Sequence, residues 1–70
     1  MSDDISQYLD LAKLFKIRYE EHGLFYLEVS IITEHLKKHN LSVFRFMNRL
    51  AEVDEELYDK FVEELNKESD

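Results

Sequence analysis

The residues of this 70-residue chain that could do chemistry fall into three small groups, and the first group is basic. Arg45, Asn48 and Arg49 are spaced by three residues and by one, so they would share one face of a helix. Arginine and asparagine are the side chains that read guanine and adenine edges in the major groove of DNA. Lys37 and Lys38 precede them across a short break and could contact phosphates. These five residues would form the binding surface of a helix-turn-helix regulator.

Two features of the sequence argue against DNA binding. The expected turn contains no glycine, and the net charge of −7, from 16 acidic and 9 basic residues, repels the phosphate backbone. Arg49 also stands three residues before Glu52, so a surface ion pair would explain it equally well. DNA binding is therefore the alternative hypothesis and not the main one.

The second group is a pair of histidines. His35 and His39 are four residues apart, a spacing at which two imidazoles on one helical face can hold a divalent metal. A complete site needs a third ligand, from His22 or from a carboxylate elsewhere, and Leu36 stands where a zinc peptidase helix has glutamate. We therefore predict no metal site and no cofactor.

The third group is the serines, which are potential nucleophiles. None lies in the glycine-flanked elbow of a hydrolase, and a chain with one glycine has no glycine-rich phosphate loop. The carboxylates concentrate on an amphipathic C-terminal segment, where solvation explains them, whereas a catalytic acid would require burial. There is no cysteine, so thiolate chemistry and cysteine-based zinc sites are excluded. The sequence predicts that the protein is not an enzyme.

The elements that must position these residues are predicted to be helices, because the chain has one glycine and no proline to interrupt them. The first helix is expected over Asp4–His22, with Asp4 and Gln7 as a capping box. Gly23 should end it in a left-handed conformation that lets Leu24 fold back toward Tyr19. Its apolar stripe comprises Ile5, Tyr8, Leu11, Ala12, Leu14, Phe15 and Tyr19.

The segment 24–39 fits two patterns. Phe25 and Val29 belong both to a strand-like alternation, with Leu27 and Ile31, and to a helical stripe that continues to Ile32 and Leu36. We predict a helix, because the segment runs on to residue 39 without a turn residue. A strand over residues 25–31 would instead give the order of a dimeric ribbon-helix-helix DNA-binding protein.

Two further helices are predicted from their capping residues. Ser42 can cap the third, with Leu41 packing on Phe46 as a hydrophobic staple. The apolar side of this helix is expected to comprise Phe44, Phe46, Met47 and Leu50. Asp54 can cap a fourth in the same way, although residues 49–54 could also be an irregularity within one long helix. The apolar face of the last segment comprises Leu57, Tyr58, Phe61, Val62 and Leu65.

The predicted fold class is therefore all-α, a compact bundle of three to four short helices. It forms a single small domain over residues 1–70, with residues 1–3 and 68–70 expected to fray. The longest apolar run, Leu24–Leu27, is far shorter than the roughly 20 residues of a membrane span, so we expect no membrane association. The acidic start, Met1–Asp4, does not resemble a secretory signal, so we expect a cytoplasmic protein.

The charge is unevenly distributed along the chain. Residues 51–70 carry nine acids against two lysines, a net −7, while residues 11–50 carry +3 and residues 1–10 carry −3. Solvated helix faces with intrahelical pairs, such as Lys16 with Glu20, are the simpler interpretation. The functional interpretation is an acidic helix that docks on a basic surface. Its partner-binding residues would be Glu55, Glu56, Asp59, Glu63 and Glu64.

We therefore expect a non-enzymatic protein–protein interaction module, a small acidic regulator or inhibitor that docks on a larger protein. A dimeric helix-turn-helix or ribbon-helix-helix DNA-binding regulator is the alternative. The nine Phe and Tyr side chains are more apolar mass than four short helices easily bury. We therefore also expect an exposed apolar surface or a homodimer.

Overall fold

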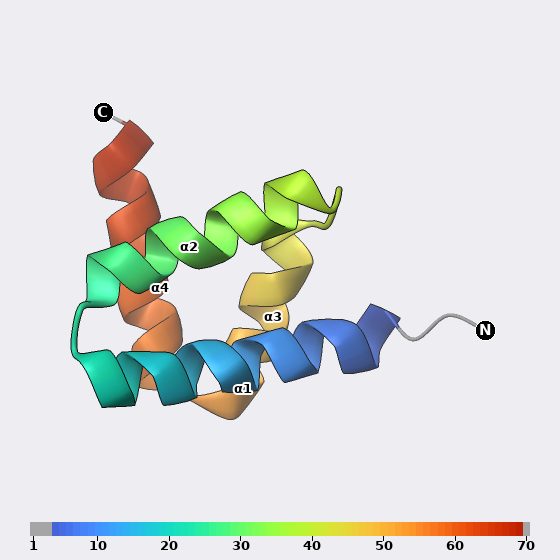
Figure 1. Ribbon diagram of the computed structural model, residues 1–70, viewed down its shortest axis with the longest axis horizontal. Helices are drawn as coiled ribbons and strands as arrows, with labels where there is room; N and C mark the ends of the chain where they lie inside the picture. Colours follow the sequence, from blue (N-terminus) through green and yellow to red (C-terminus); the bar gives the residue numbers. More distant parts are fainter. Residues whose placement is uncertain (1–3, 70) are drawn as a thin grey trace.

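The computed structural model describes the backbone of residues 4–69 and the side chains of residues 6–67 (Figure 1). The described backbone forms four helices and no strand, which confirms the all-α prediction. The helices are α1 (Asp4–His22), α2 (Phe25–Lys38), α3 (Val43–Val53) and α4 (Glu55–Ser69).

The strand alternative for residues 25–31 is wrong, because this segment lies within α2. The apolar residues at helical spacing decide between the two patterns: Val29, Ile32 and Leu36 are buried, whereas Leu27 and Ile31 are exposed. A ribbon-helix-helix arrangement is thereby excluded. The fraying expected at residues 1–3 and 70 lies outside the described residues, and α4 continues through Ser69.

The four helices form two layers (Figure 1). Helices α1 and α2 lie side by side and antiparallel, joined by the short turn at residues 23–24. Helices α3 and α4 cross behind this α1–α2 hairpin. The apolar faces of all four helices therefore meet between the layers, and the opposite side of the α1–α2 hairpin faces solvent.

The aromatic ring of Phe15 lies at the centre of the core. Its centroid is 5.9 Å from Phe25 of α2, 6.0 Å from Phe46 of α3 and 5.6 Å from Phe61 of α4, each in an edge-to-face arrangement. Edge-to-face pairs of this kind add about 0.5–1.5 kcal/mol each to the burial of their area. The buried apolar residues around this ring are Tyr8, Ala12, Val29, Ile32, Leu36, Leu50 and Leu57.

The first turn uses the glycine as predicted. Gly23 has φ +71°, in the left-handed region, and its amide donates to the carbonyl of Tyr19 at 2.8 Å. The expectation that Leu24 folds back on Tyr19 is wrong, because Leu24 is exposed and the ring of Phe25 lies 5.2 Å from that of Tyr19. Phe25 takes this place because it stands one helical turn before Val29 and so begins the core face of α2.

The predicted caps of α3 and α4 are confirmed. The hydroxyl of Ser42 accepts a hydrogen bond from the amide of Arg45 at 3.2 Å, and the carboxylate of Asp54 accepts one from the amide of Leu57 at 3.2 Å. Asp54 is extended, with φ −162° and ψ 108°, so α3 and α4 are separate helices joined by this one residue. The alternative of one long helix with an irregularity at residues 49–54 is therefore wrong.

Two apolar side chains that we assigned to the core side of their helices are exposed. Leu14 lies at the solvent edge of α1, because it stands one position, about 100° of helical rotation, before the buried Phe15. Phe44 is 72% exposed, since it stands two positions, about 200° of helical rotation, from the buried Phe46. We had assigned both residues to the core side only because they are hydrophobic.

We expect Phe46→Leu to lower the free energy of unfolding by about 1–2 kcal/mol, because Phe46 is fully buried between two other rings. Phe44→Leu, the matched change on the same helix, should alter it by less than about 0.5 kcal/mol. Urea denaturation followed by far-UV circular dichroism measures both. Equal losses for the two variants would contradict this assignment of the core.

Candidate functional site

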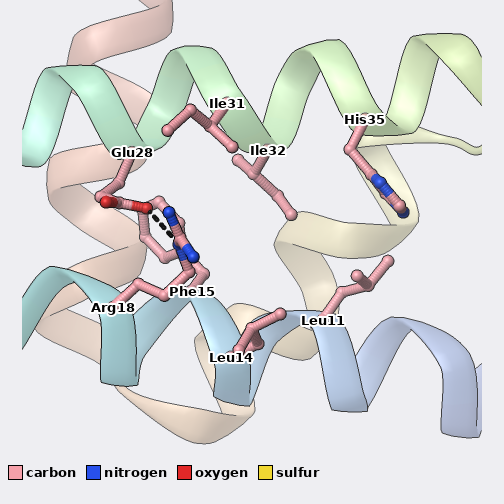
Figure 2. Close-up of a pocket in the computed structure, with 8 residues that line it drawn as sticks. All are labelled: Leu11, Leu14, Phe15, Arg18, Glu28, Ile31, Ile32 and His35. Carbon is pink, nitrogen blue, oxygen red and sulfur yellow. Dashed lines mark hydrogen bonds and ion pairs between the residues drawn. The ribbon is translucent and has the colours of Figure 1, made fainter.

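An apolar groove lies between α1 and α2, on the side of the hairpin that faces away from α3 and α4 (Figure 2). Its volume is about 170 Å³. Phe15 and Ile32 form its floor, as buried core residues, and Leu14 and Ile31 stand at its solvent edges. The remaining lining residues are Leu11, Arg18, Glu28 and His35. An apolar, solvent-open hollow of this kind is typical of surfaces that receive another apolar group.

A buried carboxylate closes one end of the groove (Figure 2). Glu28 is only 3% exposed, and its two oxygens are occupied by different partners. Arg18 donates from Nε to Oε1 at 2.9 Å, and Nδ1 of His22 lies 3.0 Å from Oε2. Both partners come from α1, so these contacts join the end of α1 to the beginning of α2.

The hydrogen bond from Arg18, followed by the contact with His22, lowers the pKa of Glu28 below its ordinary value, against the opposing effect of burial. The side chain is therefore a carboxylate at neutral pH. Because both oxygens are already engaged, Glu28 anchors two helices and is not a proton donor. Sequence reasoning missed this residue. The feature of the sequence that indicates its burial is its position, three residues after Phe25 and four before Ile32, at the edge of the buried stripe.

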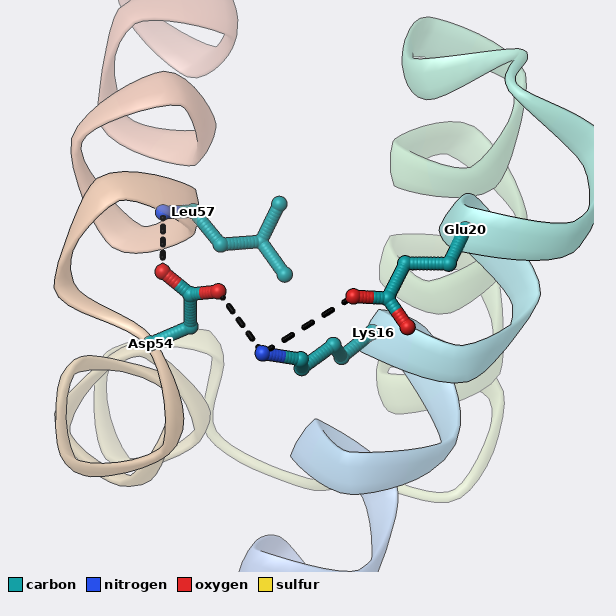
Figure 3. A network of polar contacts seen from close by, with 4 residues as sticks. All are labelled: Lys16, Glu20, Asp54 and Leu57. Atoms are coloured by element: carbon teal, nitrogen blue, oxygen red, sulfur yellow. Dashed lines mark hydrogen bonds and ion pairs between the residues drawn. The ribbon is translucent and has the colours of Figure 1, made fainter.

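A second polar network joins α1 to the corner between α3 and α4 (Figure 3). Nζ of Lys16 lies 2.9 Å from Oδ2 of Asp54 and 3.8 Å from Oε2 of Glu20. The hydrogen bond between Lys16 and Asp54 is the main cause that raises the pKa of Lys16 and lowers the pKa of Asp54. The pair of Lys16 with Glu20 is confirmed, but at that distance it is weaker than the contact with Asp54.

The histidine pair does not gain a third ligand. The rings of His35 and His39 lie 4.4 Å apart, in agreement with their shared helical face. Among the residues whose side chains are described, no group of three or more histidine, cysteine, aspartate or glutamate side chains could hold a metal ion.

The five acids predicted to bind a partner lie on α4 toward solvent. Glu55, Glu56, Asp59 and Glu63 are exposed, and Glu64 is half-buried. Three of them, Glu55, Asp59 and Glu63, follow one another at intervals of four residues and so form a row along one helical face. We call these three residues the α4 acidic row. Lys16 contacts Asp54 and Glu20 instead, and Arg18 contacts Glu28.

The residues of the DNA-binding alternative lie near the turn between α2 and α3. Lys37, Lys38, Arg45 and Asn48 are exposed, while Arg49 is half-buried. Nη2 of Arg49 lies 3.1 Å from a carboxylate oxygen of Glu52, which confirms the predicted surface pair.

The missing glycine proves to be no obstacle to the turn between α2 and α3. Asn40 adopts the left-handed conformation with φ 60°, and its amide donates to the carbonyl of Lys37 at 3.1 Å. Asparagine tolerates this region better than most residues, because its short polar side chain can hydrogen-bond locally. The objection that we drew from the absence of glycine is therefore wrong.

Comparisons of the chain with protein-family models, with curated proteins and with solved structures find no match in any of the three. No helix within residues 4–69 has the length and the hydrophobicity to cross a membrane.

Glu28→Gln should lower the free energy of unfolding at pH 7 by about 1.5–3 kcal/mol, the ordinary contribution of hydrogen bonds to charged groups, because it removes the charge of a buried carboxylate that contacts Arg18 and His22. The pKa of Glu28 is lower in the folded than in the unfolded state. Its stabilising contribution is therefore complete above the unfolded pKa of about 4.3 and is lost as the pH falls through the folded value. The difference between wild type and variant should thus shrink as the pH falls below the unfolded pKa.

Melting curves at several pH values, followed by circular dichroism, measure this difference. Glu63→Gln, which changes an exposed glutamate on α4, is the control and should melt like the wild type at every pH. A gap between wild type and Glu28→Gln that stays constant from neutral to acid pH would show that the charge of Glu28 is not what stabilises the hairpin.

Proposed function

We propose that this chain is a non-enzymatic protein–protein interaction module, a small acidic regulator or inhibitor that acts in the cytoplasm by docking on a basic surface of a larger protein. The observation that carries this proposal is the α4 acidic row. It presents three like charges to solvent along one side of a helix. The net charge of −7 adds long-range attraction to any basic partner.

The α4 acidic row places like charges next to one another on the helix. Like charges four residues apart destabilise a helix by about 0.2–0.5 kcal/mol per pair, and the row contains two such pairs. The acids that make strong contacts between helices are others, Glu28 and Asp54. A partner that supplies positive charge would relieve the repulsion between these residues.

Neutralising the α4 acidic row should weaken the association with the partner by about tenfold or more, because rim charges set the rate of encounter. The test variant is Asp59→Asn combined with Glu63→Gln. The control is Glu20→Gln combined with Glu52→Gln, which removes the same number of exposed charges elsewhere. Affinity capture from the native host, quantified by mass spectrometry at low and at high salt, measures the loss.

We expect a protein that is retained by the wild type and by the control, released by salt, and lost by the α4 variant. Equal recovery by the two variants would contradict a role of the α4 acidic row in binding.

The second candidate is a helix-turn-helix DNA-binding regulator, and the left-handed Asn40 is the observation in its favour, because it completes a short turn between α2 and α3. The outer face of α3 opposes this candidate. Glu52 stands one helical turn after Asn48 and neutralises Arg49. A carboxylate at the end of the recognition face would be repelled by the phosphates of DNA.

We therefore expect no sequence-selective DNA binding. Fluorescence anisotropy with labelled duplexes at low salt should give the same weak signal for the wild type and for Arg45→Ala combined with Arg49→Ala. Circular dichroism checks that the double variant keeps its helicity. Sequence-selective, salt-sensitive binding that the double variant abolishes would make the DNA-binding candidate the correct one.

A further inference from the structure

The solvent side of the α1–α2 hairpin carries an apolar surface with a charged border. Of the seven large apolar side chains that are exposed in the described part of the chain, five belong to it, with exposed fractions between 43% and 57%. They are Leu14, Ile17, Leu24, Leu27 and Ile31. We call this surface, together with its exposed border residues Asp10, Lys13, Glu21, Glu34 and Lys38, the hairpin face.

The helical positions of these residues explain why they share one side. On α1, Leu14 and Ile17 are three residues apart, and on α2, Leu27 and Ile31 are four apart. They stand roughly opposite the residues that enter the core, such as Ala12 and Val29. The hairpin face is therefore the uncovered side of a layer whose other side is already packed.

The register of the two antiparallel helices follows from the contacts between them. Arg18 faces Glu28 at 2.9 Å, and Leu11 and His35 line the other end of the groove (Figure 2). Counting five residues back along α1 and five forward along α2 from the ion pair, Lys13 stands level with Thr33, one residue before Glu34. Lys13 and Glu34 nevertheless lie on opposite edges of the hairpin face, so they are not placed to pair within one copy.

We infer that the hairpin face is an interface between two copies of this chain, related by a twofold axis that runs parallel to α1 and α2. In this arrangement α1 of each copy lies on α2 of the other. The two α1–α2 hairpins then pack face to face as a symmetric four-helix arrangement at the centre of the dimer, and each copy contributes the same surface.

The charges of the border select this arrangement. It places Lys13 of one copy beside Glu34 of the other, and Asp10 beside Lys38, and symmetry doubles both pairs. It also sets Leu14 on Ile31 of the second copy, so that the apolar rows coincide. A twofold axis across the helices would instead stack α1 on α1 and bring Asp10 against Glu21, which have the same sign.

The same border disfavours other occupants. A uniformly basic helix or an acidic nucleic acid would each meet like charges, because the border contains both lysines and carboxylates. The face is limited to the length of a 14-residue helix, about 20 Å, so the dimer should be weak, with a dissociation constant in the micromolar range. The α4 acidic row lies on the other layer of each copy.

Sedimentation equilibrium from about 5 μM to about 1 mM at moderate salt tests the dimer. We expect the wild type to pass from monomer to dimer in this range and Ile31→Lys to remain a monomer throughout. Phe44→Lys, which changes a more exposed apolar residue on α3, should dimerise like the wild type. Circular dichroism checks that both variants keep their helices.

A charge exchange tests the arrangement. Lys13→Glu and Glu34→Lys should each weaken the dimer by about tenfold, and the double variant should return to within about threefold of the wild type. Net charge alone predicts something different. Lys13→Glu makes the chain more negative and Glu34→Lys makes it less negative, so repulsion between copies would weaken one dimer and strengthen the other.

Three results would overturn this inference. The wild type could stay monomeric at the highest concentration, the dimer could survive Ile31→Lys, or the double charge variant could dimerise no better than the two single variants. A monomeric wild type whose Ile31→Lys variant loses a different protein would identify that protein as the occupant of the face. The α4 variants report on the proposed function separately, since their charges lie outside the hairpin face.

Discussion

The ring of Phe15 is the contact on which the rest of the structure depends. It touches one aromatic ring from each of the other three helices, and the rings of Phe46 and Phe61 also contact each other. A chain of this length buries only about 60% of the surface that its unfolded form exposes, so a few large side chains must supply most of the apolar contact. The two layers meet where these rings meet.

The polar contacts fix the orientation of helices that the apolar core brings together. Glu28 joins α1 to α2, and Asp54 joins α1 to the corner of α3 and α4. Each uses charged partners at hydrogen-bond distance, which constrains direction more strongly than apolar packing does. As a result, the inner side of the α1–α2 hairpin is fixed against α3 and α4, and its outer side remains exposed to solvent.

The helices were predictable from the sequence because their limits are decided locally. Gly23, Ser42 and Asp54 act on their immediate neighbours, and each was found in the expected role. The burial of Val29 and Leu36 likewise follows from helical spacing. The exposure of the α4 acids follows from the same periodicity.

The groove and the ion pair of Glu28 with Arg18 could not be predicted in this way. Both depend on which helices are neighbours and in what register they lie, and the spacing within one helix carries no such information. Leu14 was misplaced for a related reason, since a hydrophobic residue beside the core stripe looks the same in sequence whether a second helix covers it or not. The exposure of Phe44, in contrast, follows from its spacing, because it lies on the opposite side of α3 from the buried Phe46.

The single residue between α3 and α4 has a consequence for how the molecule opens. The amide of Asp54 donates to the carbonyl of Leu50, and its carboxylate accepts from the amide of Leu57 and from Lys16. The last turn of α3 and the first turn of α4 are therefore joined through the hydrogen bonds of one residue, with no flexible linker between them. In amide hydrogen exchange these two turns should open together, as one cooperative unit, and not as the frayed ends of separate helices.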